Sequence, residues 1–352
     1  MNVADSVANS VADSVADSVA DNKAVAWNEL EIADLTARVA ALRASMARVI
    51  IGQDNVVELL VICLLAGGHA LVEGVPGLGK TLLVKSLAQA TDMQFRRVQF
   101  TPDLMPSDIV GTEILEEDQN TRQRVFRFQQ GPVFTQVLLA DEINRAPPKT
   151  QSALLEAMQE RSVTFAGHTH KLPRPFFVLA TQNPIEQSGT YPLPEAQLDR
   201  FLLRIDVVYP TEDEEVLMVS RTTQAGLQDA EPALDVETLL RLQQLVRDIE
   251  IGDHLVRYAT RLVRATRPSE TSVDAVKKHI GWGAGPRAGQ ALVLASKARA
   301  LMQGRLAVTR DDIGAMLMPV LAHRVLRNFE AEADGIEIAD VLQSLRNEIK
   351  VA

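Results

Sequence analysis

The sequence predicts an α/β protein, with a five-stranded parallel sheet covered by helices and a smaller all-helical region after it. Five short apolar runs alternate with segments of helical spacing up to residue 210, and only helical spacing follows. Continuous apolar strands interleaved with helices are typical of a parallel sheet that is buried on both faces. The five runs are HALVEG (69–74), QFRRVQF (94–100), QVLLADE (136–142), FFVLATQN (176–183) and FLLRIDVVY (201–209).

Helices are expected on both sides of the first strand. Residues 27–50 and 54–66 carry apolar residues at helical spacing, and residues 80–90 (KTLLVKSLAQA) begin a helix directly after a glycine-rich loop. A further helix is expected over 147–160, between the third and fourth strands. It begins with Pro147 and Pro148, which suit the first turn of a helix.

Two insertions are expected to form β-hairpins. Residues 110–132 read as two strands with a turn near DQNT, and residues 162–176 as two strands that turn at AGHT. In an extended strand His168 and His170 would point the same way. No third ligand is evident in the sequence, so we do not expect a metal site there.

The two ends of the chain differ in composition from its centre. Residues 3–21 repeat VADS or close variants, which are acidic and alanine-rich and cannot bury a core. We therefore expect a disordered low-complexity tail over 1–25, an α/β core over 26–210 and a second, helical domain over 211–352.

Composition excludes several classes of protein. The net charge of −10 argues against a protein that mainly grips nucleic-acid phosphates. The single cysteine, Cys63, rules out an intrachain disulfide and a thiolate-rich metal site. The longest uncharged stretch, residues 59–72, is too short to span a bilayer, and no secretory signal is apparent. We expect a cytoplasmic protein with no membrane insertion.

The loop after the first strand carries a phosphate-binding motif. GVPGLGKT (74–81) fits G-x-x-x-x-G-K-[ST], with glycines that let successive backbone N–H groups face an anion at the start of a helix. Lys80 is expected to reach the β- and γ-phosphates of a nucleoside triphosphate, and the Thr81 hydroxyl to ligate Mg²⁺. The expected binding residues are Gly74, Pro76, Gly77, Leu78, Gly79, Lys80, Thr81 and Leu82.

Polar residues end two later strands. Asp141 and Glu142 follow the apolar run VLLA, where Asp141 is expected to hold Mg²⁺ and Glu142 to polarise an attacking water molecule. Asn183 ends the run FFVLATQ and is expected to orient that water against the γ-phosphate. An asparagine that merely caps the turn before Pro184 is the alternative interpretation.

Four blocks of the sequence resemble the MoxR family of AAA+ ATPases. The resemblance runs from about residue 30 to about residue 345, and its long central blocks make it specific. It implies a P-loop AAA+ αβα domain with hairpin insertions, a helical lid over 211–352, ATP with Mg²⁺, and assembly into a ring that usually has six subunits. The blocks are GVPGLGKT (74–81), LLADEINRAPPKTQSALLEAMQE (138–160), VLATQNPIEQSGTYPLPEAQLDRF (178–201) and GAGPRAGQALVLASKARA (283–300).

The resemblance also implies roles for residues that spacing alone does not assign. Ile51 and Gly52 match the segment that lines the adenine pocket. Arg200, in LDRF, matches the arginine finger that acts on ATP held by the neighbouring subunit. Arg287, in GPRA, matches the lid's sensor arginine, which would contact the γ-phosphate of its own subunit. The chain departs from the family at Gly285, where a serine usually stands.

The predicted task is that of a chaperone-like remodelling ATPase. The resemblance implies protein clients, often metalloenzyme complexes, reached through a partner with a von Willebrand factor A domain. A nucleic-acid motor or transcription activator is the alternative, but it needs a DNA-reading module, and neither a helix-turn-helix nor zinc-ligand spacing is apparent. A non-catalytic nucleotide switch is disfavoured because Glu142, Asn183 and Arg200 are all present.

Overall fold

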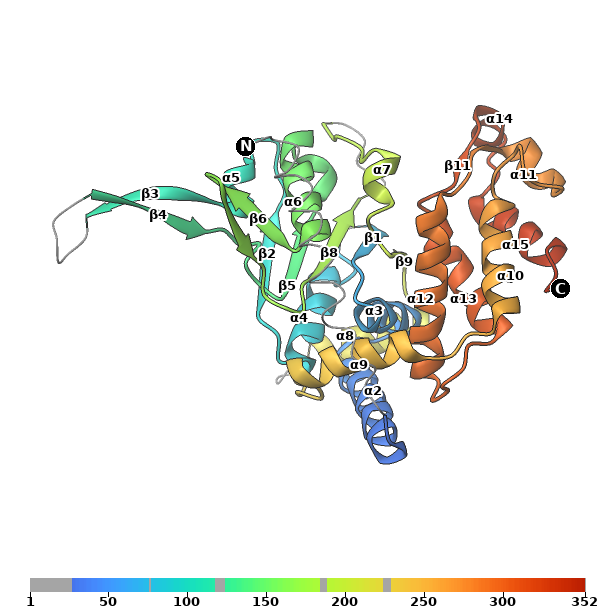
Figure 1. Ribbon diagram of the computed structural model, residues 1–352, viewed down its shortest axis with the longest axis horizontal. Coiled ribbons are helices and arrows are strands. Elements are labelled where there is room, and N and C mark those ends of the chain that lie inside the picture. Colours follow the sequence, from blue (N-terminus) through green and yellow to red (C-terminus); the bar gives the residue numbers. More distant parts are fainter. Residues whose placement is uncertain (1–26, 76, 118–123, 184–188, 224–228, 352) are drawn as a thin grey trace, which may run out of the picture.

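The sheet of the first domain is parallel and five-stranded, as predicted. The computed structural model describes residues 27–75, 77–117, 124–183, 189–223 and 229–351. The predicted tail and the DQNT turn lie outside these residues. The strands run in the order β2-β5-β8-β1-β9 (Figure 1). Their bounds are β1 Ala70–Gly74, β2 Phe95–Gln99, β5 Val137–Asp141, β8 Phe177–Gln182 and β9 Leu203–Val207.

Helices cover both faces of this sheet, because its central strands β5, β8 and β1 are apolar on both sides. Val137 and Leu139 share one core with α2 (Glu29–Val49), α3 (Asp54–Leu65) and α4 (Lys80–Ala90). Leu138 and Ala140 point the other way and pack with α6 (Pro148–Glu160). This alternation along β5 follows from the two-residue period of a strand.

The two predicted hairpins are present and touch each other. The longer one, β3 (Gly111–Glu117) and β4 (Arg124–Gln130), follows the short helix α5 (Pro106–Val110) and extends well away from the body (Figure 1). The shorter one pairs β6 (Ser162–Phe165) with β7 (His168–Lys171). The His170 ring stacks on Phe128 with centroids 4.3 Å apart, so His170 packs the hairpins together.

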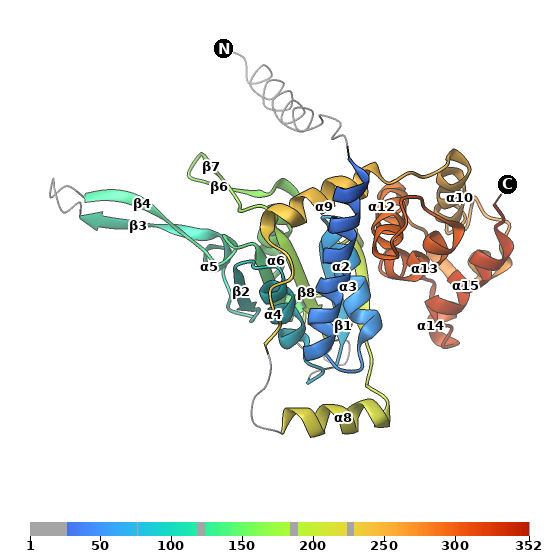
Figure 2. The same cartoon turned by 90° about the horizontal axis from the view of Figure 1, so that it is seen from below.

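Two helices follow β9 before the lid proper. α8 (Glu212–Thr222) lies at the periphery of the molecule (Figure 2). α9 (Val236–Asp248) buries Leu242 and Leu245 in the main core, and Gln243 Nε2 donates to Leu64 O of α3 at 2.8 Å. α9 therefore joins the α/β core to the lid.

The lid is helical with one exception to the prediction. Ile280–Trp282 (β10) and Leu326–Arg327 (β11) pair as a short antiparallel ladder, where only helices were expected. These strands are too short to give a periodic sequence signal. The helices are α10 Asp253–Arg264, α11 Asp274–His279, α12 Pro286–Met302, α13 Arg310–Leu321, α14 Phe329–Ala333 and α15 Ile338–Glu348.

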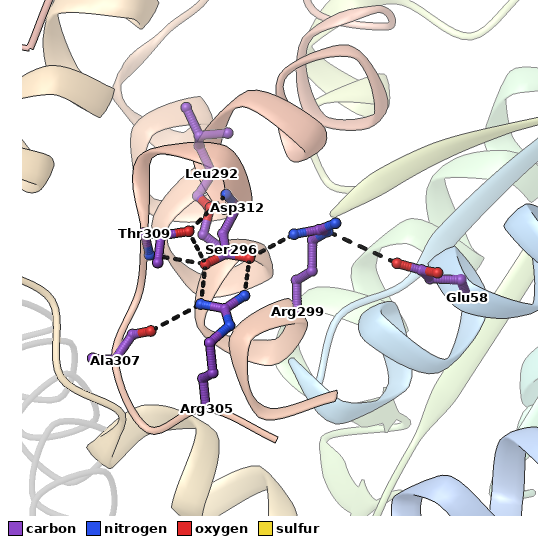
Figure 3. A network of polar contacts seen from close by, with 8 residues as sticks. All are labelled: Glu58, Leu292, Ser296, Arg299, Arg305, Ala307, Thr309 and Asp312. Carbon is purple, nitrogen blue, oxygen red and sulfur yellow. Dashed lines mark hydrogen bonds and ion pairs between the residues drawn. The ribbon is translucent and has the colours of Figure 1, made fainter. Parts of the chain in front are cut away.

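A buried carboxylate organises the lid and connects it to the core (Figure 3). Asp312, fully buried, accepts hydrogen bonds from Arg305 Nη2 at 2.7 Å and Arg299 Nη1 at 2.6 Å. Burial alone would raise the pKa of Asp312, but the hydrogen bonds from Arg305, Thr309 and Arg299 outweigh it and lower this pKa to about 2. Arg299 also lies 3.8 Å from Glu58 of α3, which ties the lid to the α/β core.

None of the helices in the part of the chain that the structure describes is both long and apolar enough to cross a bilayer.

Candidate active site

Three strand tips meet at the carboxyl edge of the sheet. β5 pairs with β8 so that Ala140 lies opposite Ala180, which brings Asp141 level with Thr181. β8 pairs with β1 so that Gln182 lies opposite Glu73. The predicted groups Asp141, Glu142 and Asn183 therefore gather beside the phosphate loop that follows β1.

The phosphate loop has the backbone that its glycines predict. Gly77 and Gly79 adopt φ of +87° and +74°, in the left-handed region that glycine favours, and a Cβ at either position would meet nothing within 4 Å. Gly79 is the N-cap of α4, with no side chain to bond the first N–H groups of that helix. Those donors remain available to an anion. Pro76 lies outside the described residues.

Lys80 reaches back across the loop. Its Nζ donates to the Gly74 carbonyl oxygen at 2.5 Å. Burial lowers the pKa of Lys80, while the charges of Asp141 and Glu142 act in the opposite direction. The charges of both carboxylates thus act on Lys80, as they should on a residue that holds phosphate beside the acidic strand tip.

Thr181 organises the acidic pair. Its Oγ1 donates to Asp141 Oδ1 at 2.6 Å and accepts the backbone N–H of Glu142 at 2.8 Å. Glu142 adopts φ 56°, ψ 50°, a left-handed conformation that costs a non-glycine residue about 1–2 kcal/mol. Thr181 is buried, so its hydroxyl is a fixed anchor for this strained turn.

Polar side chains also hold both carboxylates. Arg97 Nη2 donates to Asp141 Oδ2 at 2.7 Å. Gln99 Nε2 donates to Glu142 Oε2 at 2.7 Å, and Arg145 Nε lies 3.2 Å from the same oxygen. Arg97 and Gln99 come from β2, which pairs with β5 in parallel register.

The predicted adenine segment lies against the phosphate loop. Gln53, next to Gly52, donates from Nε2 to the Leu78 carbonyl oxygen at 3.1 Å. Gly52 has φ of +70°, and a Cβ there would lie 2.8 Å from Cβ of Glu214 in α8. Ile51 is half-buried and Leu82 is exposed, and their contacts with a bound nucleotide stay predictions.

Arg200 and Arg287 lie at the other edge of the sheet. Both line a cavity of about 370 Å³ together with Gly68 and His69, which precede β1. Leu202 N–H donates to His69 O at 2.8 Å, which fixes the Arg200 segment at the amino end of the strands. Lys80 follows β1, whose five residues span roughly 16 Å at 3.3 Å each.

The placement of Arg287 argues against a contact with the nucleotide of its own subunit. The resemblance implied such a contact for the lid arginine. The structure instead groups Arg287 with Arg200, because α12 packs on the end of α3 that precedes β1.

The cavity that holds both arginines is strongly cationic. Arg161, Arg247 and Arg324 also line it, and Asp199 is the only carboxylate among the described residues of its lining. Arg324 is nearly buried and donates to Asp199 Oδ1 at 2.7 Å and to Phe201 O at 2.6 Å. It thereby fixes the two residues that flank Arg200.

The residues present fit a magnesium nucleotide. The loop offers unpaired N–H groups at a helix start, a half-buried ammonium and a hydroxyl at Thr81, the second residue of α4. Asp141 offers carboxylate oxygen at the adjoining strand tip, which is the ligand type that Mg²⁺ prefers. The space above Gly77 and Gly79 is open, since a Cβ at either position would meet nothing within 4 Å.

Comparisons with known proteins agree with this geometry. Residues 69–203 match the family model described as the ATPase family associated with various cellular activities (AAA), and residues 273–345 match the AAA lid domain. Chaperone MoxR1 of Mycobacterium tuberculosis is 46% identical over 82% of this chain and 76% of its own length. The chain belongs to the MoxR family of AAA+ ATPases.

Further relatives support the MoxR assignment over most of the chain. Protein MoxR of Paracoccus denitrificans is 33% identical, over 84% of this chain and 90% of its own. A crystal structure of a protein from Cytophaga hutchinsonii, described provisionally as an ATPase, superposes with a TM-score of 0.85 at 39% identity. It covers 92% of this chain and 98% of the other.

The departure from the MoxR pattern at Gly285 is sterically neutral. Gly285 is the N-cap of α12, with φ −81° and ψ 177°, and a Cβ there would meet nothing within 4 Å. A serine would fit, and its absence removes only a capping hydroxyl from the helix that carries Arg287.

Sequence reasoning missed the groups that hold the acidic residues. Thr181 lies inside an apolar strand, where threonine is common for its β-branched shape alone. Gln99 ends the second strand, just as Asp141 and Asn183 end or follow theirs, and that shared position is the signal that could have found it. Arg324 carried no signal, because its role depends on a contact 125 residues away.

Proposed function

We propose that this MoxR protein hydrolyses ATP in sites that are each completed by a neighbouring copy of the chain. One observation carries the proposal. The phosphate loop and its acidic partners lie at the carboxyl edge of the sheet, whereas Arg200 and Arg287 lie together at the amino edge. A single subunit thus presents two halves of a site on opposite edges, which is the arrangement of a head-to-tail, ring-forming interface.

The residues at the carboxyl edge bind the nucleotide and prepare water. The N–H groups of 77–80 and the Lys80 ammonium hold the phosphates, and Thr81 and Asp141 hold Mg²⁺, which supplies charge neutralisation of the phosphate oxygens. Glu142 accepts a proton from the attacking water, and Asn183 orients that water.

The residues at the amino edge act on the neighbour. Arg200 donates to the γ-phosphate as charge develops on it, an interaction worth about 10³ to 10⁵ in rate. Arg287 lines the same cavity and is assigned to the same neighbouring nucleotide. The isolated subunit should therefore bind ATP and hydrolyse it slowly.

The task we propose is remodelling or activation of protein clients. Relatives named chaperone and MoxR support it. We further propose a ring of six, a von Willebrand factor A domain partner, and action in the cytoplasm, where the buried thiol of Cys63 fits the absence of disulfides. No observation on the described residues favours the nucleic-acid alternative, and it is not proposed here.

The test is the dependence of ATP turnover on assembly. Turnover per subunit should rise with protein concentration as rings form, and addition of DNA should leave it unchanged. Arg200→Ala should bind ATP with unchanged affinity and lose at least about 10³ in turnover. Full turnover by a species that sedimentation shows to be a monomer would refute the shared site.

A further inference from the structure

Helix α8 presents an apolar surface that is exposed among the residues the structure describes. Every side chain from Glu212 to Thr222 is exposed except Glu214, which is half-buried. Val216–Val219 (VLMV) form one complete turn, since an α-helix has 3.6 residues per turn, so apolar groups point in every direction. Val216 is 64% exposed and Val219 is 52% exposed. One turn of apolar side chains left exposed in the middle of a polar helix marks a surface that can pack against a partner.

The first turn of the same helix is strongly acidic. Glu212, Asp213, Glu214 and Glu215 occupy it, and Thr211 with Glu214 forms a capping box that fixes where the helix starts. A surface that fits α8 must therefore combine an apolar floor with several cations.

The lid carries such a surface. A groove of about 770 Å³ lies between α10 and α12, with Val256, Val263, Val293 and Leu294 in its lining. Four cations and no carboxylate are among the described residues that line it, namely Arg247, Arg264, Arg267 and Lys297. Glu270 pairs with Arg264 and Arg267 from outside the lining, so the groove remains net cationic.

The two surfaces lie on opposite edges of the subunit. Glu214 of α8 packs on Gly52, in the segment that contacts the phosphate loop at the carboxyl edge. The groove shares Arg247, Gln290 and Leu294 with the cavity of Arg200 and Arg287 at the amino edge. In a head-to-tail ring the carboxyl edge of one subunit faces the amino edge of the next, which brings α8 toward the neighbour's groove.

We propose that α8 of each subunit docks in the groove between α10 and α12 of the neighbouring subunit's lid. The inference rests on the proposed shared site, since it uses the same pairing of edges. The acidic first turn meets the arginines and the lysine, and Val216–Val219 cover the valines of the floor. Nucleotide held beside α8 would thereby be coupled mechanically to the next lid.

Cross-linking between differently tagged full-length chains tests this docking. One chain carries Val219→Cys in α8 and the other Val256→Cys in the groove, and Cys63 is buried and does not interfere. A short bismaleimide should join the two chains in assembled protein. Leu30→Cys, exposed on α2 and outside the groove, is the matched control and should give no product with Val219→Cys.

Charge reversal adds a second arm. Glu212→Lys with Glu215→Lys should reduce the cross-linked yield about tenfold, because the groove then repels the helix. Asp334→Lys, at an exposed acid that follows α14 directly, should leave the yield unchanged. An equal yield for the reversed helix, or a cross-link within one doubly substituted chain at monomer concentrations, overturns the docking.

Turnover and sedimentation of the same samples separate the two proposals. Rings that hydrolyse ATP through Arg200 yet give no Val219–Val256 cross-link overturn the docking of α8 alone. Protein that never assembles overturns both the docking and the shared site.

Discussion

Replacement of Thr181 by valine tests how the catalytic turn is held. The change replaces the hydroxyl by a methyl group of nearly equal volume at a buried position, so the shape that packs against β5 and β1 is retained. It deletes the hydrogen bond donated to Asp141 and the acceptor for the Glu142 N–H. Glu142 is then no longer held in its left-handed conformation.

The expected loss follows from those two contacts. A hydrogen bond of this kind contributes about 1 kcal/mol net, and one to a charged group about 1.5–3 kcal/mol. If about 1.4–2.8 kcal/mol of this stabilisation is lost in the transition state, turnover falls about 10- to 100-fold, because each 1.36 kcal/mol is tenfold in rate.

The assay is steady-state phosphate release at saturating Mg²⁺ and ATP, with nucleotide affinity measured separately. Thr181→Val should lose about 10- to 100-fold in kcat and bind ATP as the unaltered protein does. Thr181→Ser keeps the hydroxyl and is the control, with an expected loss below about threefold. Turnover of the valine variant within twofold of the serine variant would refute the anchoring role.

Two further predictions concern the free energy of unfolding, which is measured by urea denaturation. Asp312→Asn should lower the free energy of unfolding by about 3–5 kcal/mol, because it leaves two guanidinium groups around a neutral side chain. Asp311→Asn, at the exposed neighbouring position, is the control and should change the free energy of unfolding by no more than about 0.5 kcal/mol. A loss below about 1 kcal/mol for both variants would contradict the network's role. Burial lowers the pKa of His69 to about 4, below its ordinary 6.5, so the unfolded state binds more protons between these values and stability falls as pH drops through them. That contribution is about 2 kcal/mol between pH 7.5 and 5, and His69→Gln should lose this part of the pH dependence; an identical dependence would show that His69 is not the group responsible.

The sequence predicted what depends on local spacing. The five strands are close to their predicted bounds because each is a short apolar run between polar turns, and the fold of the MoxR family follows from their alternation with helices. The phosphate loop directly follows β1, and the acidic pair lies at the end of β5. In a parallel sheet both strands end at the same edge, so the two groups are expected there together.

What the sequence could not predict depends on distant contacts. The strand order could not be predicted, because it depends on where the chain re-enters the sheet after each connecting helix. The position of Arg287 depends on how α12 packs against α3, which no local pattern encodes. The resemblance implied a contact with the nucleotide of the same subunit, whereas the structure groups Arg287 with Arg200. The support from Thr181 and Gln99 becomes visible only when β8 and β2 are set beside β5.

The most direct test of the shared site is subunit complementation. Arg200→Ala chains retain an intact Glu142, and Glu142→Gln chains retain an intact Arg200. A site is complete where an Arg200→Ala chain holds the ATP and a Glu142→Gln chain is the neighbour that supplies Arg200. Equal mixing should make roughly a quarter of the interfaces complete, with turnover far above either variant alone. Mixed rings, verified to contain both chains, that hydrolyse ATP no faster than their parents would contradict the account.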